Sequence, residues 1–285
     1  MTFTEYLKEK KYSDATISRY GIYSSRFLTW LTGEGLQEET FTYTELLDFM
    51  RYCQSQGVTK RTVHNILCVV RHYCNYLTCE GKRTDNPAAG VFIRGLVRKL
   101  PMHLLTPDEM GELYKGYIIQ LHVDASKKIM LGLMVYQGLS VGEIMRIEAR
   151  DIRPKEGKIR IRGTKKTNER LLDLNAGQAV ALQQYLNENK FKEGMLFIEP
   201  RKKRTSLLNI NNRIQYMFRQ LKQLNPKVTN AKQIRSSVIT YWLRQNNLRQ
   251  VQYMAGHKYV SSTQRYQVSN LDDLKNELQL HHPMR

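Results

Sequence analysis

Cysteine is scarce in this sequence, and its cysteines form no C-x-x-C pair. All four lie in the first third of the 285-residue chain, at Cys53, Cys68, Cys74 and Cys79. A chain of this length folds without disulfides, so we expect buried thiols and a reducing compartment. A zinc site that adds His64 or His72 would lack the usual ligand spacing, so we predict no metal site.

Long apolar runs are also absent, and the amino terminus lacks the charged and then apolar pattern of a secretion signal. We therefore expect no association with a membrane and a cytoplasmic location.

Acidic residues are few, with 26 Asp and Glu against 45 Lys and Arg, which gives a net charge of +19. Such a balance favours a polyanionic partner, nucleic acid before a membrane surface. Residues 1–100 hold 14 basic and 10 acidic residues, while the remaining 185 hold 31 and 16. We therefore expect the second part of the chain to make most of the phosphate contacts. On composition alone, a basic protein that does not act on nucleic acid stays an alternative.

Four amphipathic helices are predicted in the first hundred residues. Residues 2–31 have the spacing of two helices, and Ser13 can cap the second. A third helix covers 41–53, and a fourth begins at Thr59 or Thr62. One face of the fourth helix is apolar, at Val63, Ile66, Leu67, Val70, Tyr73, Cys74 and Leu77. A stripe of this kind predicts a buried core.

A second set of elements begins after a basic connector. Thr106 and Pro107 are typical of a helix start, since they supply a capping residue and a proline at the first position. We also predict a helix after Ser140 that extends through Arg146 to Arg150. The other predicted helices cover 127–136, 176–190 and 208–224, and the predicted strands cover 158–162, 169–174 and 195–198.

The predicted fold is mainly α with a small β-sheet. We divide the chain into a helical domain at 1–97, a linker at 98–105 and an α+β domain at 106–285.

The stretch from Lys232 to Tyr266 holds the strongest chemical signal. Arg235 lies near the start of one helical pattern, His257 follows a second, and Tyr266 comes nine residues later. A cation, an imidazole and a phenol placed this way can converge on one phosphate. The set suits phosphoryl transfer with the phenol as nucleophile, because that chemistry is mostly positioning and charge stabilisation.

This stretch resembles the carboxy-terminal signature of the tyrosine recombinases, the phage integrase family. The signature is H-x-x-R, then L-G-H, then Tyr nine residues on. It appears here as Lys232 to Arg235, Ala255 to His257, and Tyr266. The helical first part also resembles the core-binding domain of that family, through the T-x-x-x-Y run at 16–20 and the Asn-Pro-Ala at 86–88. The resemblance thus covers nearly the whole chain and implies a helical core-binding domain followed by an α+β catalytic domain.

The resemblance implies a site-specific recombinase, an integrase or transposase of a mobile element. Tyr266 would attack a DNA phosphodiester and leave a 3′-phosphotyrosyl intermediate, with Arg235 and His257 stabilising the phosphate. A 5′ hydroxyl from a partner strand then attacks that intermediate. The number of phosphoesters is unchanged, so no ATP, metal or other cofactor is required. The family acts as a tetramer on double-stranded DNA sites, so we expect a homotetramer on DNA, associated with the nucleoid.

Two positions depart from the family pattern. Lys232 stands where the family usually has His, and Ser140 stands where the box T-G-L-R-x-x-E-L has its phosphate-binding arginine. One interpretation of Ser140 is a helix cap, because Ser140 and Glu143 have capping-box spacing. Another is that the helix amino terminus itself holds a phosphate oxygen. Lys232 is the first candidate for the missing cation.

The turn between the strands at 158–162 and 169–174 resembles the hairpin that carries a catalytic lysine in this family. Counting back from Arg170 favours Lys165 as the general acid for the leaving 5′ oxygen, with Lys166 as the alternative. An exposed hairpin lysine with no catalytic role remains possible. The expected DNA contacts are Lys60, Arg61, Arg162, Lys166, Arg201, Lys202, Lys203 and Arg204.

Two further functions stay open. A relative that binds DNA without cleaving it, in an architectural or regulatory role, is favoured by Ser140 and Lys232. A type IB topoisomerase shares the chemistry, but the helical first part resembles the recombinases more. Residues 270–280 predict a last helix with one apolar face, and the resemblance implies that it docks on a neighbouring protomer.

Overall fold

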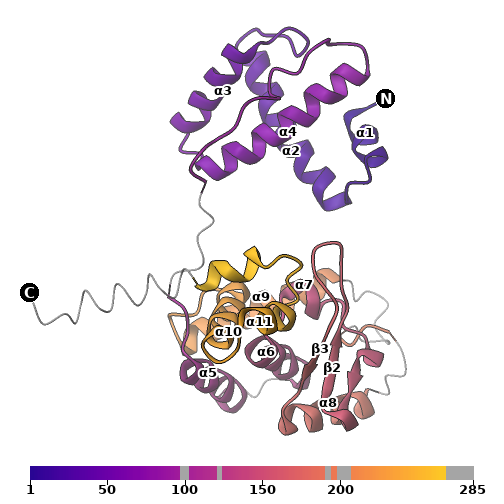
Figure 1. The fold of residues 1–285 in the computed structure, drawn as a ribbon, viewed down its shortest axis with the longest axis vertical. Helices are drawn as coiled ribbons and strands as arrows, with labels where there is room; N and C mark the ends of the chain where they lie inside the picture. Colours follow the sequence, from indigo (N-terminus) through magenta and orange to yellow (C-terminus); the bar gives the residue numbers. More distant parts are fainter. Residues whose placement is uncertain (97–102, 121–123, 190–193, 198–206, 268–285) are drawn as a thin grey trace, which may run out of the picture. The chain divides into compact units, whose positions relative to one another are not determined.

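The structure is a computed structural model that describes residues 1–96, 103–120, 124–189, 194–197 and 207–267. It divides into two compact units, Met1–Arg98 and Lys99–Arg285 (Figure 1). The predicted tail helix at 270–280 lies outside the described residues.

The amino-terminal unit is a bundle of four helices. They are α1 (Phe3–Glu9), α2 (Asp14–Gly33), α3 (Tyr43–Ser55) and α4 (Lys60–Cys79). Thr2, Thr42 and Thr59 cap α1, α3 and α4 through their side chains, so threonines that precede an apolar pattern fix most of the helix starts. The core lies where α2 packs against α4, and it is filled by Phe27, Leu31, Leu46, Phe49, Ile66 and Val70. The four helices predicted from the sequence are confirmed.

The cysteines differ in burial. Cys53 and Cys74 are buried, Cys68 is half-buried and Cys79 is exposed, and all four are free. The prediction of buried thiols is therefore wrong for Cys79, which lies at the end of α4 where the helix leaves the core. Burial raises the pKa of the Cys74 thiol to about 12, so this thiol stays protonated.

The second unit is built around one buried helix, α6 (Ala125–Gln137) (Figure 1). Its sequence is apolar nearly all round, and nine of its residues are buried. It contacts α5 (Pro107–Gln120), α8 (Ala176–Glu188), α9 (Leu207–Leu224) and α10 (Ala231–Gln245). Among the residues of this unit that the structure describes, the other α-helices are α7 (Val141–Ile144), α11 (Leu248–Ala255) and a helical segment at 261–267.

A small antiparallel sheet lies beside the helices of this unit. Its strands are β1 (Ile152–Arg153), β2 (Lys158–Ile161) and β3 (Arg170–Asp173), in the order β1-β2-β3. Short 3₁₀ turns at Ala149–Asp151 and Pro154–Glu156 flank β1. Opposite Ile161 stands Arg170, and both side chains are buried, as alternation along a strand with one inward face requires. The predicted hairpin is confirmed, while β1 was not predicted because it has only two residues.

Two local predictions are wrong. The helix after Ser140 ends at Ile144, so Arg146 and Arg150 do not lie on it. The predicted strand at 195–198 is reduced to an isolated bridge between Glu148 and Met195, within the residues that the structure describes. The amide of Leu196 donates to the carbonyl of Ile147 at 2.8 Å, and this pairing draws the backbone away from a longer helix.

Among the described residues, no helix combines the length and the apolar character that a membrane span needs.

Candidate functional site

Two helices position the cation and the imidazole of the predicted set. The side chain of Asn230 caps α10 by accepting from the amide of Gln233 at 3.1 Å, and Arg235 is the fifth residue of that helix. Helix α11 ends at Gly256, whose φ of +66° is the left-handed conformation that favours glycine, and His257 follows at once. A Cβ at Gly256 would also clash with the guanidinium of Arg170. Glycine is therefore required here for two separate reasons.

The guanidinium of Arg235 is anchored at the ends of α6 and α11 and on α7. Its Nη1 donates to the carbonyl of Gly138 at 2.6 Å and to Glu143 at 3.1 Å, while Nη2 donates to the carbonyl of Ala255 at 2.6 Å. Burial lowers the pKa of Arg235, but a guanidinium still stays charged at neutral pH. Ala255 is two residues before His257 in the chain. The bond to its carbonyl therefore holds the Arg235 guanidinium near the imidazole and ties α10 to the end of α11.

Glu143 is a buried carboxylate between two arginines. Its side chain contacts Arg170 at 2.7 Å and Arg235 at 3.1 Å, and the residue is 3 % exposed. Burial would raise the pKa of Glu143, but the charges of Arg235 and Arg170 outweigh it and lower the pKa to about 2. One negative charge thus faces two positive charges, so the cluster keeps a net positive charge beside the site.

Sequence reasoning missed the role of Arg170 in this cluster. The sequence predicts no role for Arg170, yet its side chain is among the largest fully buried ones. The signal was present, since Arg170 stands two residues before Leu172 on the inward face of β3. Its Nε and Nη2 have no hydrogen-bond partner among the described residues.

Ser140 caps α7, as the S-x-x-E spacing predicted. Its hydroxyl donates to Glu143 at 2.7 Å, its amide donates to the same oxygen at 2.8 Å, and the amide of Glu143 points back to the Ser140 hydroxyl at 3.4 Å. Helix α7 spans only four residues, and the Ser140 hydroxyl is already bonded. The capping interpretation accounts for Ser140, and the alternative of a phosphate held by this helix terminus has no further support.

The rings of His257 and Tyr266 are stacked. Their centroids are 5.9 Å apart with an interplanar angle of 15°, and Tyr266 is half-buried on the helical segment at 261–267. The His257 Nδ1 lies 2.9 Å from the hydroxyl of Thr263. Burial, and after it the charges of Arg235 and Arg170, lowers the pKa of His257 to about 4. The imidazole is therefore neutral at physiological pH.

The hairpin lysines lie in a turn that is fixed beside His257. Thr167 forms a bridge with His257, and the amide of Asn168 donates to the carbonyl of Gly256 at 3.0 Å. Lys165 and Lys166 themselves are exposed, and neither forms an ion pair with any described residue. The base of the turn is thus held at the site, while its lysines are free to reach a ligand.

Three other basic side chains near the site differ in whether they form an ion pair within the protein. Lys232 is exposed, has no ion-pair partner among the described residues and lies three residues before Arg235, hence on the same side of α10. Arg146 is also exposed, and its Nη1 lies over Gly142 at the start of α7. Arg150, by contrast, is paired with Glu148 at 2.7 Å.

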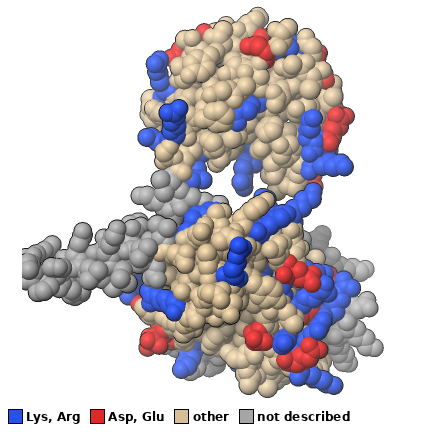
Figure 2. All heavy atoms as spheres, in the orientation of Figure 1, with Lys and Arg blue, Asp and Glu red and all other residues tan. Residues whose placement is uncertain are grey.

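The predicted DNA contacts are only partly available for comparison. Lys60 and Arg61 are exposed in the first turn of α4. Arg162 is ion-paired with Glu148 and Asp151, so its guanidinium is committed within the protein. Figure 2 shows Lys and Arg side chains on the surface of each unit, and Asp and Glu side chains are fewer on the same surfaces. Lys166 is exposed in the hairpin turn, and the other four predicted contacts lie outside the described residues: Arg201, Lys202, Lys203 and Arg204.

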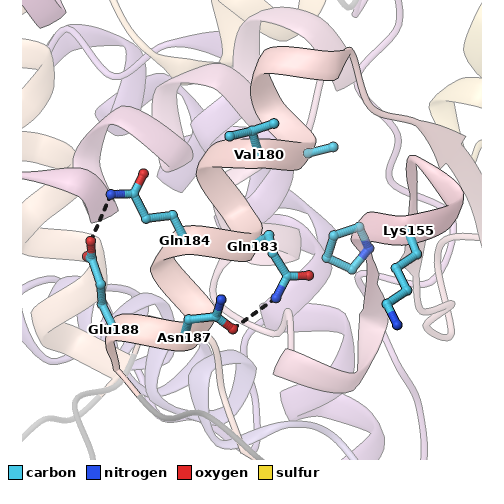
Figure 3. Close-up of a pocket in the computed structure, with 8 residues that line it drawn as sticks. Lys155, Val180, Gln183, Gln184, Asn187 and Glu188 are labelled. Carbon is cyan, nitrogen blue, oxygen red and sulfur yellow. Dashed lines mark hydrogen bonds between the residues drawn. The ribbon is translucent and has the colours of Figure 1, made fainter.

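A separate cavity of about 470 Å³ lies on the outer face of α8. It is lined by Lys155 and Val180 together with a polar row on α8, where Gln183 bonds Asn187 and Gln184 bonds Glu188 (Figure 3). None of the predicted site residues lines it. In the part of the chain that the structure describes, no group of three or more His, Cys, Asp or Glu side chains is placed to hold a metal.

Comparison with known proteins identifies the family. Residues 103–272 match the phage integrase family, and residues 1–81 match the N-terminal SAM-like domain of phage integrases. The chain belongs to the phage integrase family. It is a tyrosine recombinase, an enzyme of site-specific DNA recombination.

Relatives of this recombinase span its whole length. The tyrosine recombinase XerC of Oceanobacillus iheyensis is 25 % identical over 295 residues, which cover 99 % of this chain and 95 % of that protein. Among solved structures, a lambda integrase dimer bound to a COC′ core site has a TM-score of 0.68 at 17 % identity, covering 93 % of this chain and 92 % of that one. The Tn1549 transposon integrase in complex with transposon right end DNA has a TM-score of 0.67 at 14 % identity, covering 99 % of each chain. These two structures show a shared fold.

Proposed function

We propose that this recombinase cuts and rejoins DNA strands through a 3′-phosphotyrosyl intermediate on Tyr266. The observation that carries the proposal is the stack of Tyr266 on His257, next to the guanidinium of Arg235. In the cleavage step the Tyr266 oxygen bonds to phosphorus and the bond from phosphorus to the 5′ oxygen breaks. The phenol proton leaves to solvent, which reaches the half-buried ring, and the 5′ oxygen gains a proton from Lys165.

Arg235 is suited to hold the phosphate in this reaction. Of the five N–H groups of a guanidinium, three are bonded to Gly138, Glu143 and Ala255, so two remain for phosphate oxygens. The three internal bonds fix the direction of the other two, which is the preorganisation that stabilises charge in a transition state. The buried Arg170 adds positive potential without touching the ligand, because Glu143 neutralises only one of the two arginines.

The cation that the family has at position 140 must come from elsewhere. We assign this role to Lys232, which is exposed, unpaired among the described residues and one turn from Arg235. Arg146, which lies over the start of α7, is the rival. Lys232→Ala and Arg146→Ala separate the two, since only the residue that contacts the phosphate will lower strand cleavage by about 10²-fold or more when removed.

The partner in this proposal is double-stranded DNA, bound by a tetramer of the chain. The net charge of +19 favours a polyanion. The solved relatives include the transposon integrase on transposon end DNA and a lambda integrase tetramer bound to a Holliday junction. We infer by analogy that this chain is the integrase or transposase of a mobile element, and that it acts in the cytoplasm at the nucleoid.

A second candidate is a relative that binds DNA but cleaves poorly or not at all. The observation that favours it is Ser140, which supplies no cation and whose hydroxyl is bound to Glu143. The two candidates differ in one outcome, the formation of a covalent protein–DNA adduct.

The test uses a nicked suicide duplex, made from the ends of the DNA element that encodes the protein, and denaturing gels. Wild type and Tyr266→Phe are compared with Tyr259→Phe, a matched control whose side chain is 67 % exposed. We expect an adduct with wild type and Tyr259→Phe and none with Tyr266→Phe. Specific binding without any adduct would instead support the non-cleaving candidate.

A further inference from the structure

Thr263 lies next to Nδ1 of the His257 imidazole and is fully buried, with 0 % of its surface exposed. Its hydroxyl oxygen is 2.9 Å from Nδ1 of His257. We propose that Thr263 is a positioning residue, which holds the neutral imidazole in the tautomer that carries its proton on Nε2 and so aims an N–H donor at the phosphate. This inference rests on the proposed function, because it assigns the phosphate contact to His257.

The donors and acceptors at this contact decide the tautomer. A buried hydroxyl has one proton to donate, and among the described residues the hydrogen-bond partner of the Thr263 hydroxyl is Nδ1 of His257. If Nδ1 were unprotonated, it would accept that proton, and the remaining ring proton would sit on Nε2. If Nδ1 carried the proton, it would donate to the Thr263 oxygen and leave the hydroxyl proton buried without an acceptor, which is unfavourable. The geometry therefore favours an unprotonated Nδ1.

Other contacts hold the residue that bears the ring, but they do not choose between its nitrogens. The carbonyl of His257 accepts from the Gln252 side chain at 3.1 Å, and its backbone bridges to Thr167. The stack on Tyr266 fixes the plane of the ring. Among the contacts that the described residues make with this ring, only the bond to Thr263 distinguishes Nδ1 from Nε2.

The position of Thr263 couples the imidazole to the nucleophile. Thr263 and Tyr266 are three residues apart in the helical segment at 261–267, so they lie on the same side of one helix. The helical segment that carries the nucleophile therefore also carries the residue that sets the tautomer of His257.

The test compares Thr263→Val, which keeps the shape and removes the hydroxyl, with Thr263→Ser, which restores it. The first measurement is ¹⁵N NMR of the imidazoles at pH 7, with His257→Gln to assign the signal among the seven histidines. We expect an unprotonated Nδ1 in wild type and Thr263→Ser, and a protonated or mixed Nδ1 in Thr263→Val. A wild-type Nδ1 signal in Thr263→Val would overturn the proposal.

The second measurement is strand cleavage on the suicide duplex. We expect Thr263→Val to cleave DNA about 10- to 100-fold more slowly than wild type, because a functional imidazole loses the hydrogen bond that orients its ring. Thr263→Ser should cleave at nearly the wild-type rate. Equal losses in the two variants would mean that Thr263 only fills space and would overturn the proposal. Because the NMR comparison needs no DNA, it decides the matter even if wild type forms no adduct, an outcome that would refute the proposed function instead.

Discussion

Replacing Glu143 by Gln should destabilise the second unit strongly, because it removes the one buried negative charge between Arg170 and Arg235. The ordinary pKa of 4.5 falls to about 2 at Glu143. At about 1.4 kcal/mol for each pH unit, the charged form contributes about 3 kcal/mol at neutral pH. Glu143→Gln also leaves two guanidinium groups without a counter-charge, so we expect a total loss of about 3–5 kcal/mol.

Urea unfolding at pH 7 measures this loss. Trp30 belongs to the first unit and Trp242 to the second, so a Trp30→Phe background makes the fluorescence of Trp242 report on the second unit alone. A loss of about 3 kcal/mol lowers the unfolding midpoint by about 1–3 M urea. The matched control is Glu169→Gln, which breaks an exposed ion pair with Arg160 and should leave the unfolding midpoint nearly unchanged.

The pH dependence gives an independent check on Glu143. A carboxyl whose pKa is lower in the folded state stabilises the protein above its unfolded pKa, and this contribution is lost as pH falls from about 4.5 to about 2. Wild type should therefore lose stability over this range more steeply than Glu143→Gln. Equal unfolding midpoints for Glu143→Gln and Glu169→Gln at pH 7 would refute the claim that this carboxylate holds the cluster together.

Three further predictions concern the same site. Gly256→Ala should lower the unfolding midpoint and abolish adduct formation, since its Cβ meets the buried Arg170 guanidinium at a residue with φ of +66°; an active Gly256→Ala would show that the cluster relaxes. Ser140→Ala should cost about 1 kcal/mol in urea unfolding through the lost cap while adduct formation persists, and a loss of cleavage greater than this destabilisation explains would assign Ser140 a direct role. His257 has its pKa lowered from 6.5 to about 4, so its contribution to stability is lost as pH falls through that window. His257→Gln should flatten the unfolding curve against pH between 6.5 and 4, and an unchanged slope would contradict the lowered pKa.

The helices and the hairpin could be predicted from the sequence because their signals are local. Periodic apolar residues gave α4 and α6, and Thr106 with Pro107 gave the start of α5. The S-x-x-E spacing gave the cap at Ser140. In each case the residues that form the element also carry the pattern that predicts it.

The rest depended on contacts between distant segments. Helix α7 ends early because residues 147–149 pair with 194–196, which no local pattern shows. The spacing of Arg235, His257 and Tyr266 predicts the side chains of the site, but it does not predict the residues that hold these side chains in position. Arg170 lies far in sequence from Arg235, and a threonine such as Thr263 has no catalytic chemistry of its own. Only the folded chain therefore shows that Arg170 contacts Glu143 and that Thr263 contacts His257.

Mapping the covalent protein–DNA adduct tests most directly whether Tyr266 is the residue that becomes linked to DNA. Wild-type protein is trapped on the suicide duplex, digested with nuclease and protease, and the modified peptide is sequenced by mass spectrometry. We predict a nucleotide linked through a 3′ phosphate to Tyr266. A nucleotide on another residue, such as the exposed Tyr253 or Tyr259, or a specifically bound duplex that never becomes linked, would contradict the account.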